Sequence, residues 1–586
     1  MPNDESRFHG GDRIAWALKA HGVSFVFTLC GGHISPILTG CKAQGLRVVD
    51  CRHEATAVFA ADAVARLTGL PGVAAVTAGP GLTNTITAVK NAQLAQSPMV
   101  IFAGAVPTLL RGRGALQDID QRKLVAPHVK LFRSIRRVQE LGRAAEEAFA
   151  VACEGVRGPV VIECPVDLLY PEENVRQWYD DAAGKGTSIQ DRILRRHLNR
   201  HFTKIFAGNH DASDVSEPHG RDVPVPAPSR SSVASAGAAV AKAERPLMVI
   251  GSQALAIPGE ADRIATAVTK LGIPVYLSGM ARGLLGREHP LQMQHARRKA
   301  LREADCVILA GVPCDFRLDY GRQIRRSTVL IAANRSAAEA RMNRRPTITV
   351  LGDLGRFLEE LAKDSQISPN NWNEWIAKLR DQDRQREIEI KNQASAQGNY
   401  VNPIRFLREL DKSVGEKAIL IADGGDFVAS ASYIVRPRGP LAWLDPGPFG
   451  TLGVGAGFAL GASFARPGSE VWILFGDGAF GYGLAEFDTF ARHGIPVIGV
   501  VGNDASWSQI AREQVKLLKD DVGTVLGRTD YHAVAEGFGA AGLLVRHDSQ
   551  ISNALAKARE IAGSGRPVLM NVWLDKSDFR EGSVSM

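Results

Sequence analysis

Residues 472–507, WILFGDGAFGYGLAEFDTFARHGIPVIGVVGNDASW, hold the pattern that decides the fold. An apolar, strand-like run ends in the turn Gly476-Asp477-Gly478, a helix-like segment follows, and a second apolar run ends in Gly502-Asn503-Asp504. Parallel strands joined by a right-handed crossover bring such turns to one edge of a sheet, so Asp477 and Asn503 are expected to face one ligand. A carboxylate and an amide oxygen suit Mg²⁺, which completes its shell with water and phosphates. The alternative is an ordinary Rossmann-like unit whose glycines only make tight turns.

The spacing of the two turns resembles a known motif. GDG, then 24 residues, then Asn-Asp is similar to the diphosphate-binding motif of thiamine diphosphate (ThDP) enzymes. The resemblance implies that Asp477, Asn503 and the main-chain carbonyl of Ala505 hold the Mg²⁺ that carries the cofactor's diphosphate. It also places three neighbours in the cofactor-binding turn, namely Gly476, Gly478 and Ala479.

The composition is typical of a globular enzyme with several domains. With 586 residues the chain is too long for one core, and its 45% apolar and 23% charged residues are ordinary. The net charge of +8 is a mild excess, and no nucleic-acid-binding module is visible. Seven cysteines without a CxxC pair and a polar N-terminus without a signal peptide favour a cytoplasmic protein. Glycine and proline interrupt the longest uncharged stretches, so no membrane span is expected.

Residues 8–170 alternate amphipathic helices with apolar strands, as expected of a parallel α/β sheet. Within them, RHEATAVFAADAVAR (52–66) and AGPGLTN (78–84) resemble the pyrimidine-binding domain of ThDP enzymes. The resemblance implies that Glu54 hydrogen-bonds N1′ of the cofactor's aminopyrimidine ring and so activates it. A lone glutamate in the first turn of a helix is more often structural, because the helix dipole stabilises it there.

Residues 181–240 interrupt the α/β pattern. They contain the basic segment RILRRHLNRHFTKIF, followed by a stretch rich in proline, serine and glycine that is predicted to be a linker. Between residues 193 and 206, apolar positions recur at nearly helical spacing, with arginine and histidine between them. Such a helix could pack on a neighbouring domain, which is the expected role, touch an acidic lipid surface, or help to hold an anionic nucleotide tail.

Residues 245–352 form a second α/β unit with glycine-containing turns but no GxGxxG fingerprint. In the resembled family this middle domain binds FAD in acetohydroxyacid synthases, and ADP or CoA in acyl-CoA lyases and decarboxylases. ADP or CoA is therefore the expected ligand here, and FAD is less expected. Residues 366–400 are mostly helical and highly charged, and are predicted to connect this unit to the next.

The third α/β unit contains LDPGPFGTLGVGAGFALGA (444–462), which resembles the family's GxGTMGxGLPAAIGA segment. In the family, the residue after Gly-Thr lies beneath the cofactor and enforces its bent conformation. Leu452 stands at this position, and the carbonyl of Gly450 is implied to accept a hydrogen bond from the 4′-amino group. The bend brings the 4′-imine against C2 of the thiazolium, so an apolar wedge here serves the chemistry.

Together these features predict an α/β protein with three doubly wound parallel-sheet domains of the ThDP-enzyme type. The predicted boundaries are 1–180 for the pyrimidine-binding domain, 181–240 for a helical insert and linker, 241–365 for the middle domain, 366–400 for the helical connector, and 401–586 for the diphosphate-binding domain. The family builds its active sites across a dimer interface, so a homodimer or homotetramer is expected.

Further motifs point to two groups of ThDP enzymes. GRGALQDIDQ (112–121) and WSQIAREQ (507–514) resemble acetolactate synthases in general. The closer resemblance is to the acetolactate synthase-like proteins classed with 2-hydroxyacyl-CoA lyases, through FTLxGGHISP (27–36), KNAQLAQSP (90–98), CDFRLDYG (314–321), DGGDF (423–427) and DFREGS (578–583). It implies a lyase that cleaves a 2-hydroxyacyl-CoA to formyl-CoA and an aldehyde one carbon shorter, or joins these products in reverse. The alternative is an acetolactate synthase-like carboligase acting on 2-ketoacids.

Three further residues are predicted to contact the substrate. His33 follows two glycines in a loop after a strand, where the backbone can approach a ligand, although a surface histidine is about equally expected. Gln117 aligns with a family glutamine near the thiazolium, with Leu116 in place of the usual aromatic neighbour. Arg580 could meet a phosphate or carbonyl oxygen of an acyl-CoA if the tail closes as a lid, as in oxalyl-CoA decarboxylases. A disordered terminus is the alternative.

Overall fold

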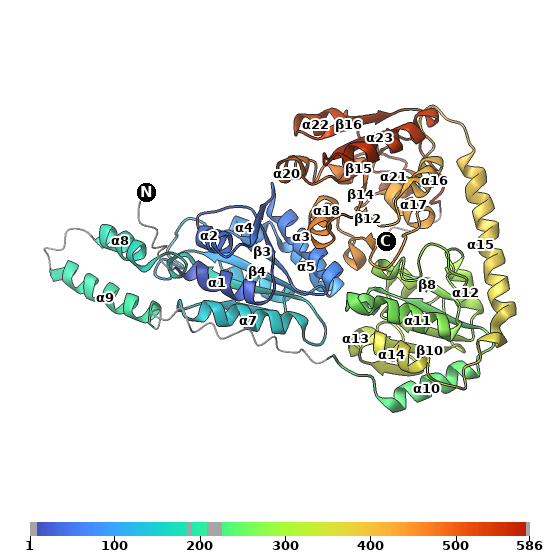
Figure 1. The fold of residues 1–586 in the computed structure, drawn as a ribbon, viewed down its shortest axis with the longest axis horizontal. Coiled ribbons are helices and arrows are strands. Elements are labelled where there is room, and N and C mark those ends of the chain that lie inside the picture. Colours follow the sequence, from blue (N-terminus) through green and yellow to red (C-terminus); the bar gives the residue numbers. More distant parts are fainter. Residues whose placement is uncertain (1–8, 184–188, 208–224, 582–586) are drawn as a thin grey trace. The chain divides into compact units, whose positions relative to one another are not determined.

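The computed structural model describes residues 9–183, 189–207 and 225–581, and the chain divides into two compact units. Unit 1 comprises residues 1–65 and 70–223, and unit 2 comprises residues 66–69 and 224–586. Figure 1 shows sheets with helices on both faces in each unit, and all strand pairs within the three sheets are parallel. The predicted α/β class with three parallel sheets is confirmed.

Unit 1 contains a six-stranded sheet in the order β2-β1-β3-β4-β6-β5. Its strands are β1 (Phe25–Thr28), β2 (Arg47–Asp50), β3 (Gly72–Val76), β4 (Met99–Ala105), β5 (Leu131–Ser134) and β6 (Pro159–Pro165). Its α-helices are α1 (Gly10–Ala20), α2 (Ser35–Ala43), α3 (Glu54–Thr68), α4 (Pro80–Thr83), α5 (Ile86–Ala95), α6 (Gln121–Val125), α7 (Glu140–Cys153), α8 (Glu172–Ala183) and α9 (Ile189–Ile205). The central strands β3, β4 and β6 are buried along their whole length because helices cover both faces.

The first half of unit 2 is the middle domain, with a five-stranded sheet in the order β11-β10-β9-β7-β8. Its strands are β7 (Pro246–Ile250), β8 (Val275–Leu277), β9 (Cys306–Ala310), β10 (Val329–Asn334) and β11 (Ile348–Leu351). Its α-helices are α10 (Arg230–Ala241), α11 (Ala261–Leu271), α12 (Arg297–Glu303), α13 (Ala337–Ala340) and α14 (Leu354–Leu361).

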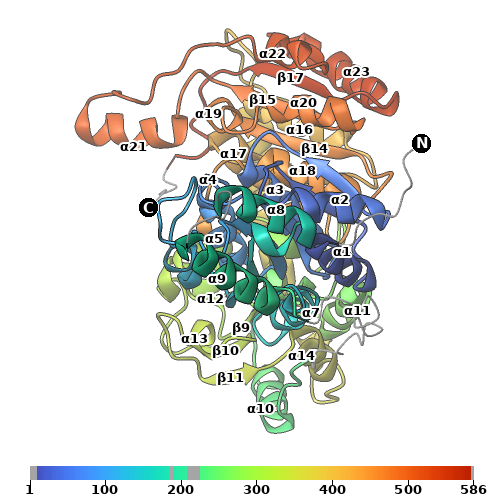
Figure 2. The ribbon, with the colours of Figure 1, turned by 90° about the vertical axis from the view of Figure 1, so that its left-hand side faces the viewer.

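The second half of unit 2 is the C-terminal domain, with a six-stranded sheet in the order β13-β12-β14-β15-β17-β16. Its strands are β12 (Ile419–Ala422), β13 (Trp443–Leu444), β14 (Val471–Gly476), β15 (Ile498–Asn503), β16 (Ala541–Val545) and β17 (Val568–Trp573). Its α-helices are α16 (Pro403–Ser413), α17 (Asp426–Ile434), α18 (Val454–Ala465), α19 (Asp477–Phe480), α20 (Glu486–His493), α21 (Ser508–Leu518), α22 (Tyr531–Gly537) and α23 (Ile551–Gly563). Helix α21 has no buried residue and projects from this domain in Figure 2.

A long helix, α15 (Asn373–Ala394), links the two domains of unit 2 and lies within the predicted connector (Figure 1). Toward the middle domain, the indole nitrogen of Trp375 donates to the carbonyl of Pro246 at 3.0 Å, and Asp383 accepts from the amide of His295 at 2.8 Å. Toward the C-terminal domain, Glu387 accepts from Arg436 at 3.0 Å. Hydrogen bonds on both sides therefore fix the position of each domain against α15.

The segment predicted as an insert and linker differs in part from expectation. The helical spacing between 193 and 206 is confirmed, because α9 covers residues 189–205. Residues 230–240 are not a linker but form most of α10, which Ser229 caps by accepting from the amide of Ser232, and which buries one apolar side. Residues 208–224 of the predicted linker lie outside the described residues, and the domain boundaries stay predictions. No helix in the described part of the chain is long and apolar enough to cross a membrane.

Candidate active site

The two turns that follow β14 and β15 lie side by side in the C-terminal domain. Gly476 of β14 pairs with Gly502 of β15, and Asp477 and Asn503 come next along the two segments. Both side chains are buried, with 3% and 0% of their surface exposed. The expectation that these residues meet at one edge of the sheet is therefore correct, and their roles as ligands stay predictions.

Hydrogen bonds orient both side chains toward the turn after β15. The Asn503 amide nitrogen donates to the carbonyl of Thr529 and to Oδ1 of Asn571, both at 3.3 Å. Its Oδ1 then accepts from the amide of Ala505 at 3.3 Å, while Oδ2 of Asp477 accepts from the amide of Ser506 at 3.2 Å. The oxygens of both side chains thus converge on the backbone of residues 505 and 506.

The electrostatics of this edge suit a cation. Burial, and secondarily the charge of Asp504, raise the pKa of Asp477 to about 7. Burial also raises the pKa of Asp504, although the hydrogen bond that its Oδ2 accepts from Ser508 at 2.5 Å acts to lower this pKa. Buried carboxylates near one another are stabilised by a bound cation. In the described residues, no three His, Cys, Asp or Glu side chains are grouped closely enough to hold a metal ion by themselves.

Leu452 lies half-buried just before α18 and packs against the turn that follows β12. A Cβ on Gly424 of that turn would lie 2.1 Å from Cδ2 of Leu452, so a larger residue at 424 would displace the leucine. The close approach of the two turns holds Leu452 in place. Its half-exposed side chain leaves apolar surface available to a ligand.

Asp423 also fixes this region, and the sequence did not indicate it. Its carboxylate accepts from the amides of Gly453 at 2.9 Å and Gly455 at 2.7 Å, which flank the first residue of α18. Asp423 is 3% exposed, and burial raises its pKa to about 7, although the two hydrogen bonds oppose the shift. The DGGDF motif marked the segment, but only the fold shows that Asp423 binds amides 30 and 32 residues later.

Asp423→Asn is expected to reduce the pH dependence of stability. The pKa of Asp423 in the folded state, about 7, lies above its ordinary value of 3.8. The protonated carboxyl therefore stabilises the fold fully at a pH below 3.8, and this contribution is lost as the pH rises through 7. Between about pH 5 and about pH 8 the loss amounts to roughly 3 kcal/mol. Melting temperatures measured from about pH 5 to about pH 8 should therefore fall for the wild type relative to the variant. Asp262→Asn, at an exposed position of α11, is the control, and equal pH profiles for all three proteins would refute this role of Asp423.

In unit 1, Glu54 is the first residue of α3 and is 7% exposed. Its Oε2 accepts a hydrogen bond from Nδ2 of Asn84 at 3.0 Å. Asn84 belongs to the AGPGLTN motif, and so the two motifs that resemble the pyrimidine-binding domain are in direct contact. With Oε2 held by Asn84, the carboxyl group is oriented to offer its other oxygen to a ligand.

His33 and Gln117 contact the start of the same motif. His33 is half-buried, and its Nδ1 lies 3.3 Å from Oγ1 of Thr77. Gln117 has a left-handed backbone (φ +68°) and packs on Gly79, where a Cβ would lie 2.7 Å from the Gln117 carbonyl oxygen. The segment from Thr77 to Asn84 therefore joins all three predicted catalytic residues of unit 1.

Gln121 holds this segment in place and was not among the predicted site residues. It is 2% exposed, and its Oε1 accepts from the amide of Gly79 at 3.1 Å. Its Nε2 donates to the carbonyl of Gly104 at 3.1 Å and to Oε1 of the buried Glu163 at 3.0 Å. The nearby Gln117 drew attention to the loop, but the partners of Gln121 lie 17 and 42 residues away.

Asn84→Ala is expected to lower kcat by about 2- to 10-fold, because it removes the hydrogen bond that orients Glu54, and such a bond contributes about 0.5–1.5 kcal/mol. Asn91 provides a matched control, since its Nδ2 donates to Oδ2 of Asp62 at 3.0 Å, between the same two helical regions. Asn91→Ala should lower the melting temperature without a comparable loss of kcat. If both variants lost activity in proportion to stability, Asn84 would be only structural.

The C-terminal tail packs on α17. Phe579 is buried against the edge of Tyr433, with the ring centroids 6.1 Å apart. The guanidinium of Arg580 lies over the Tyr433 ring, 5.3 Å from the ring centroid. It also donates a hydrogen bond to the carbonyl of Ala429 at 3.4 Å. Residues 579 and 580 therefore belong to the fold, whereas residues 582–586 lie outside the described part. The predicted closing of the tail as a lid stays a prediction.

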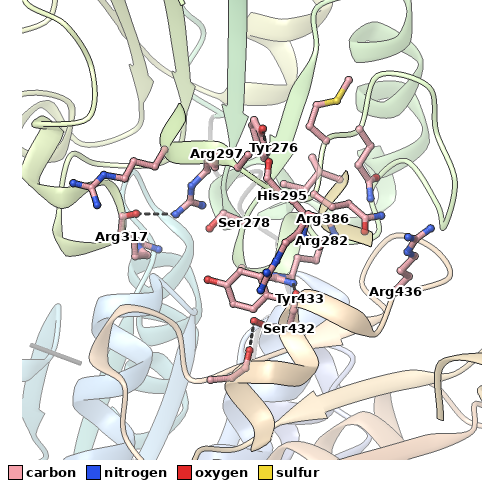
Figure 3. A pocket seen from close by; sticks show the side chains of 18 of the residues that line it. Tyr276, Ser278, Arg282, His295, Arg297, Arg317, Arg386, Ser432, Tyr433 and Arg436 are labelled. Atoms are coloured by element: carbon pink, nitrogen blue, oxygen red, sulfur yellow. Dashed lines mark hydrogen bonds between the residues drawn. The ribbon is translucent and has the colours of Figure 1, made fainter. Parts of the chain in front are cut away.

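Arg580 also lines a cavity of about 1090 Å³ within unit 2 (Figure 3). The walls come from the middle domain, α15, α17 and the tail. The cavity is strongly cationic, being lined by Arg282, Arg297, Arg298, Lys299, Arg317, Arg386, Arg436 and Arg580. Its acidic lining residues are Glu389, Asp445 and Glu581. Such an excess of guanidinium groups is typical of sites for phosphate-bearing ligands.

Two of these arginines, Arg282 and Arg297, are half-buried, and desolvation lowers the pKa of both. Arg282 donates to the carbonyl of Ser432 at 2.5 Å. Arg297 donates to the carbonyl of Arg317 at 2.8 Å (Figure 3). Neutral carbonyls compensate a buried cation less well than an anion does. An anionic ligand would therefore be bound strongly here.

Family profiles for thiamine pyrophosphate enzymes match the chain in three consecutive regions. The N-terminal TPP-binding domain matches residues 8–124, the central domain residues 233–361, and the C-terminal TPP-binding domain residues 423–572. The two TPP-binding regions contain Glu54 and Asp477, the residues that carried the resemblance. The chain belongs to the thiamine pyrophosphate enzyme family.

Within this family, the chain is similar over nearly its whole length to proteins named 2-hydroxyacyl-CoA lyase 2. The protein from Danio rerio is 49% identical, covering 99% of this chain and 94% of its own. The protein from Homo sapiens is 48% identical, covering 99% and 92%. A probable acetolactate synthase from Mycobacterium bovis is 34% identical, covering 97% and 96%. The predicted resemblance to the lyases, with acetolactate synthases more distant, is confirmed.

Proposed function

We propose that this protein is a ThDP- and Mg²⁺-dependent carbon–carbon lyase. It cleaves a 2-hydroxyacyl-CoA to formyl-CoA and an aldehyde shortened by one carbon, and it can join the two in reverse. The observation that carries this proposal is the cavity of about 1090 Å³ with its arginine lining. The phosphates of CoA suit both this volume and this number of guanidinium groups.

The residues proposed to bind the cofactor fall into two groups. Bound ThDP would supply the carbon nucleophile and the electron sink for cleavage. In unit 2, Asp477, Asn503 and the carbonyl of Ala505 are proposed to hold Mg²⁺, and through it the diphosphate, beside Gly476, Gly478 and Ala479. Leu452 and the Gly450 carbonyl are proposed to hold the bent form. In unit 1, Glu54, held by Asn84, donates to the pyrimidine nitrogen N1′.

His33 and Gln117 are proposed to bind the reacting oxygens of the substrate. Burial lowers the pKa of His33, so the imidazole is neutral near pH 7 and can accept or donate a hydrogen bond. Its contact with Thr77 sets the position of the ring. Gln117, which packs on Gly79, would offer its amide as a neutral donor.

The cavity is proposed to hold the nucleotide part of CoA, or ADP, with FAD less expected.

Arg297→Ala and Arg580→Ala should each raise the KM for a 2-hydroxyacyl-CoA by about 10- to 100-fold with a smaller change in kcat, because a charge-assisted hydrogen bond contributes about 1.5–3 kcal/mol. Lys417→Ala, at an exposed position before β12, is the control and should leave KM unchanged. Deletion of the chain after Ser577 should match Arg580→Ala or exceed it. An unchanged KM in the arginine variants would place CoA elsewhere.

A homodimer or homotetramer with active sites at the dimer interface is proposed. Helix α21 directly follows the proposed Mg²⁺ turn and buries none of its residues in the described structure. Leu517 and Leu518 on it are 70% and 73% exposed, and Ile510 is 50% exposed. Apolar side chains gathered on one projecting helix favour burial against another subunit.

A cytoplasmic location is proposed on the cysteine chemistry. All seven cysteines are free thiols in the structure, and five of them are buried. Burial raises the pKa of Cys41 to about 12 and that of Cys314 to about 11, which makes these thiols unreactive. Free, unreactive cysteines in this number are usual in a reducing compartment.

The experiment that tests the function offers both substrate classes to the ThDP- and Mg²⁺-loaded protein. A short 2-hydroxyacyl-CoA should give an aldehyde and formyl-CoA, while pyruvate should give little acetolactate. A yellow, FAD-containing protein that makes acetolactate from pyruvate and leaves the thioester intact would overturn the proposal in favour of a carboligase.

A further inference from the structure

Helix α9 has a buried face and an outward face of different character. It lies beside α8 in Figure 1, and both helices face the viewer in Figure 2. Leu198, Phe202 and Ile205, at spacings of four and three residues, are its buried positions. These three residues account for the expected packing role, and the outward face remains to be explained.

Arginines dominate one side of the exposed surface. Six residues line a shallow hollow of about 570 Å³, namely Arg192, Arg195, Arg196, Asn199, Arg200 and Thr203. Their spacing of three and four residues places them in one stripe along the helix. Over its whole length α9 carries five arginine or lysine residues and one acidic residue, Asp191.

Aliphatic side chains stand exposed next to this stripe. Ile189 is 74% exposed and Ile193 is 65% exposed. Ile189, Ile193, Arg196 and Arg200 are separated by four, three and four residues along α9. This spacing aligns them in a single ridge directly opposite the buried face. A ridge of this kind combines two large aliphatic groups with long cationic side chains that have apolar stems.

We propose that this ridge docks on a membrane surface rich in anionic lipids. The isoleucines would enter the boundary between headgroups and acyl chains, and the arginines would contact lipid phosphates. Charge complementarity selects this occupant, because the same ridge on a second copy would set arginine against arginine. Nucleic acid is disfavoured, since single strands are bound through exposed aromatic rings and the only Phe, Tyr or Trp of α9, Phe202, is buried.

The test is co-sedimentation of the full-length protein with vesicles of phosphatidylcholine alone or with about one-third phosphatidylserine. Binding should require phosphatidylserine and should weaken at high salt. Arg192→Glu/Arg196→Glu/Arg200→Glu should lower the partition coefficient by about 100-fold or more, since each basic residue near an anionic surface contributes about fivefold. Ile189→Ser/Ile193→Ser should lower it by about tenfold or more at unchanged charge.

A triple variant elsewhere controls for net charge. Lys363→Glu/Arg384→Glu/Lys391→Glu changes the charge equally at exposed positions of unit 2 and should leave binding unchanged. All variants should keep the lyase kcat, because α9 is outside the proposed site. The proposal is overturned if the wild type does not bind the anionic vesicles, if the control triple loses as much binding, or if the isoleucine pair has no effect. A change in oligomer mass or loss of RNA binding in the α9 triple, without loss of vesicle binding, would also overturn it.

Discussion

Glu54→Gln and Glu54→Ala are expected to lower kcat by about 10²- to 10⁴-fold while leaving the fold intact. Glu54 is buried, begins α3, and has one oxygen fixed by Asn84. The glutamine retains the shape and loses the acid, so it cannot pass a proton to the pyrimidine nitrogen. The measurement is the steady-state rate of aldehyde release at saturating substrate, ThDP and Mg²⁺.

The matched control for this prediction is Asp62→Asn in the same helix. Asp62 is fully buried and accepts from Asn91 at 3.0 Å, as Glu54 accepts from Asn84. Asp62→Asn should reduce thermal stability more than activity. A Glu54→Ala protein with full activity, or equal rate losses at Glu54 and Asp62, would refute the assigned role.

Asp477→Asn is expected to abolish the stabilisation of the protein by ThDP and Mg²⁺ and with it the activity. A ligand at a hundredfold excess over its Kd stabilises the folded state by about 2.7 kcal/mol, which appears as a rise in melting temperature. The variant removes the buried carboxylate that accepts from Ser506 and faces the proposed cation. The melting temperature with and without ThDP and Mg²⁺ measures the effect independently of catalysis.

Asp504→Asn tests whether a neighbouring carboxylate could replace Asp477 as the ligand of the proposed cation. Asp504 is half-buried, and its Oδ2 accepts a hydrogen bond from Ser508 at 2.5 Å. This variant should keep most of the rise in melting temperature that ThDP and Mg²⁺ cause. A full thermal shift in Asp477→Asn, or an equal loss in both variants, would show that Asp477 is not the principal ligand.

Most of the fold could be predicted from the sequence because parallel strands buried on both faces are continuous apolar runs. Cys306–Ala310 and Pro246–Ile250 are such runs, and both strands are buried along their whole length. The ladder between β14 and β15 continues to Gly476, the first residue of the predicted Gly476-Asp477-Gly478 turn. The edge strand β5 was not predicted, since all four of its residues are only half-buried and carry no apolar run.

The candidate site could be predicted in part. Short motifs identified Asp477, Asn503, Glu54 and Leu452, because each lies in a local turn or helix start. The residues that hold them were missed because their contacts join distant segments. Asn84 lies 30 residues from Glu54, and Asp423 reaches Gly455 32 residues away. Sequence spacing carries no information about such pairs until the fold is known.

The cavity was the least predictable feature. Its arginines come from α12 and other segments of the middle domain, from α15, from the segment after α17 and from the tail. Only the packing of the two domains on α15 assembles them. The sequence indicated Arg580 alone, through its position in the DFREGS motif. Arg317 lies in CDFRLDYG, a motif that was recognised without a role for its arginine.

The most direct test of the proposed lyase follows a single carbon. A 2-hydroxyacyl-CoA labelled with ¹³C at the thioester carbon should yield labelled formyl-CoA and an equal amount of unlabelled aldehyde, only when ThDP and Mg²⁺ are present. Thioester that stays intact under conditions in which the same protein converts pyruvate to acetolactate would contradict the account.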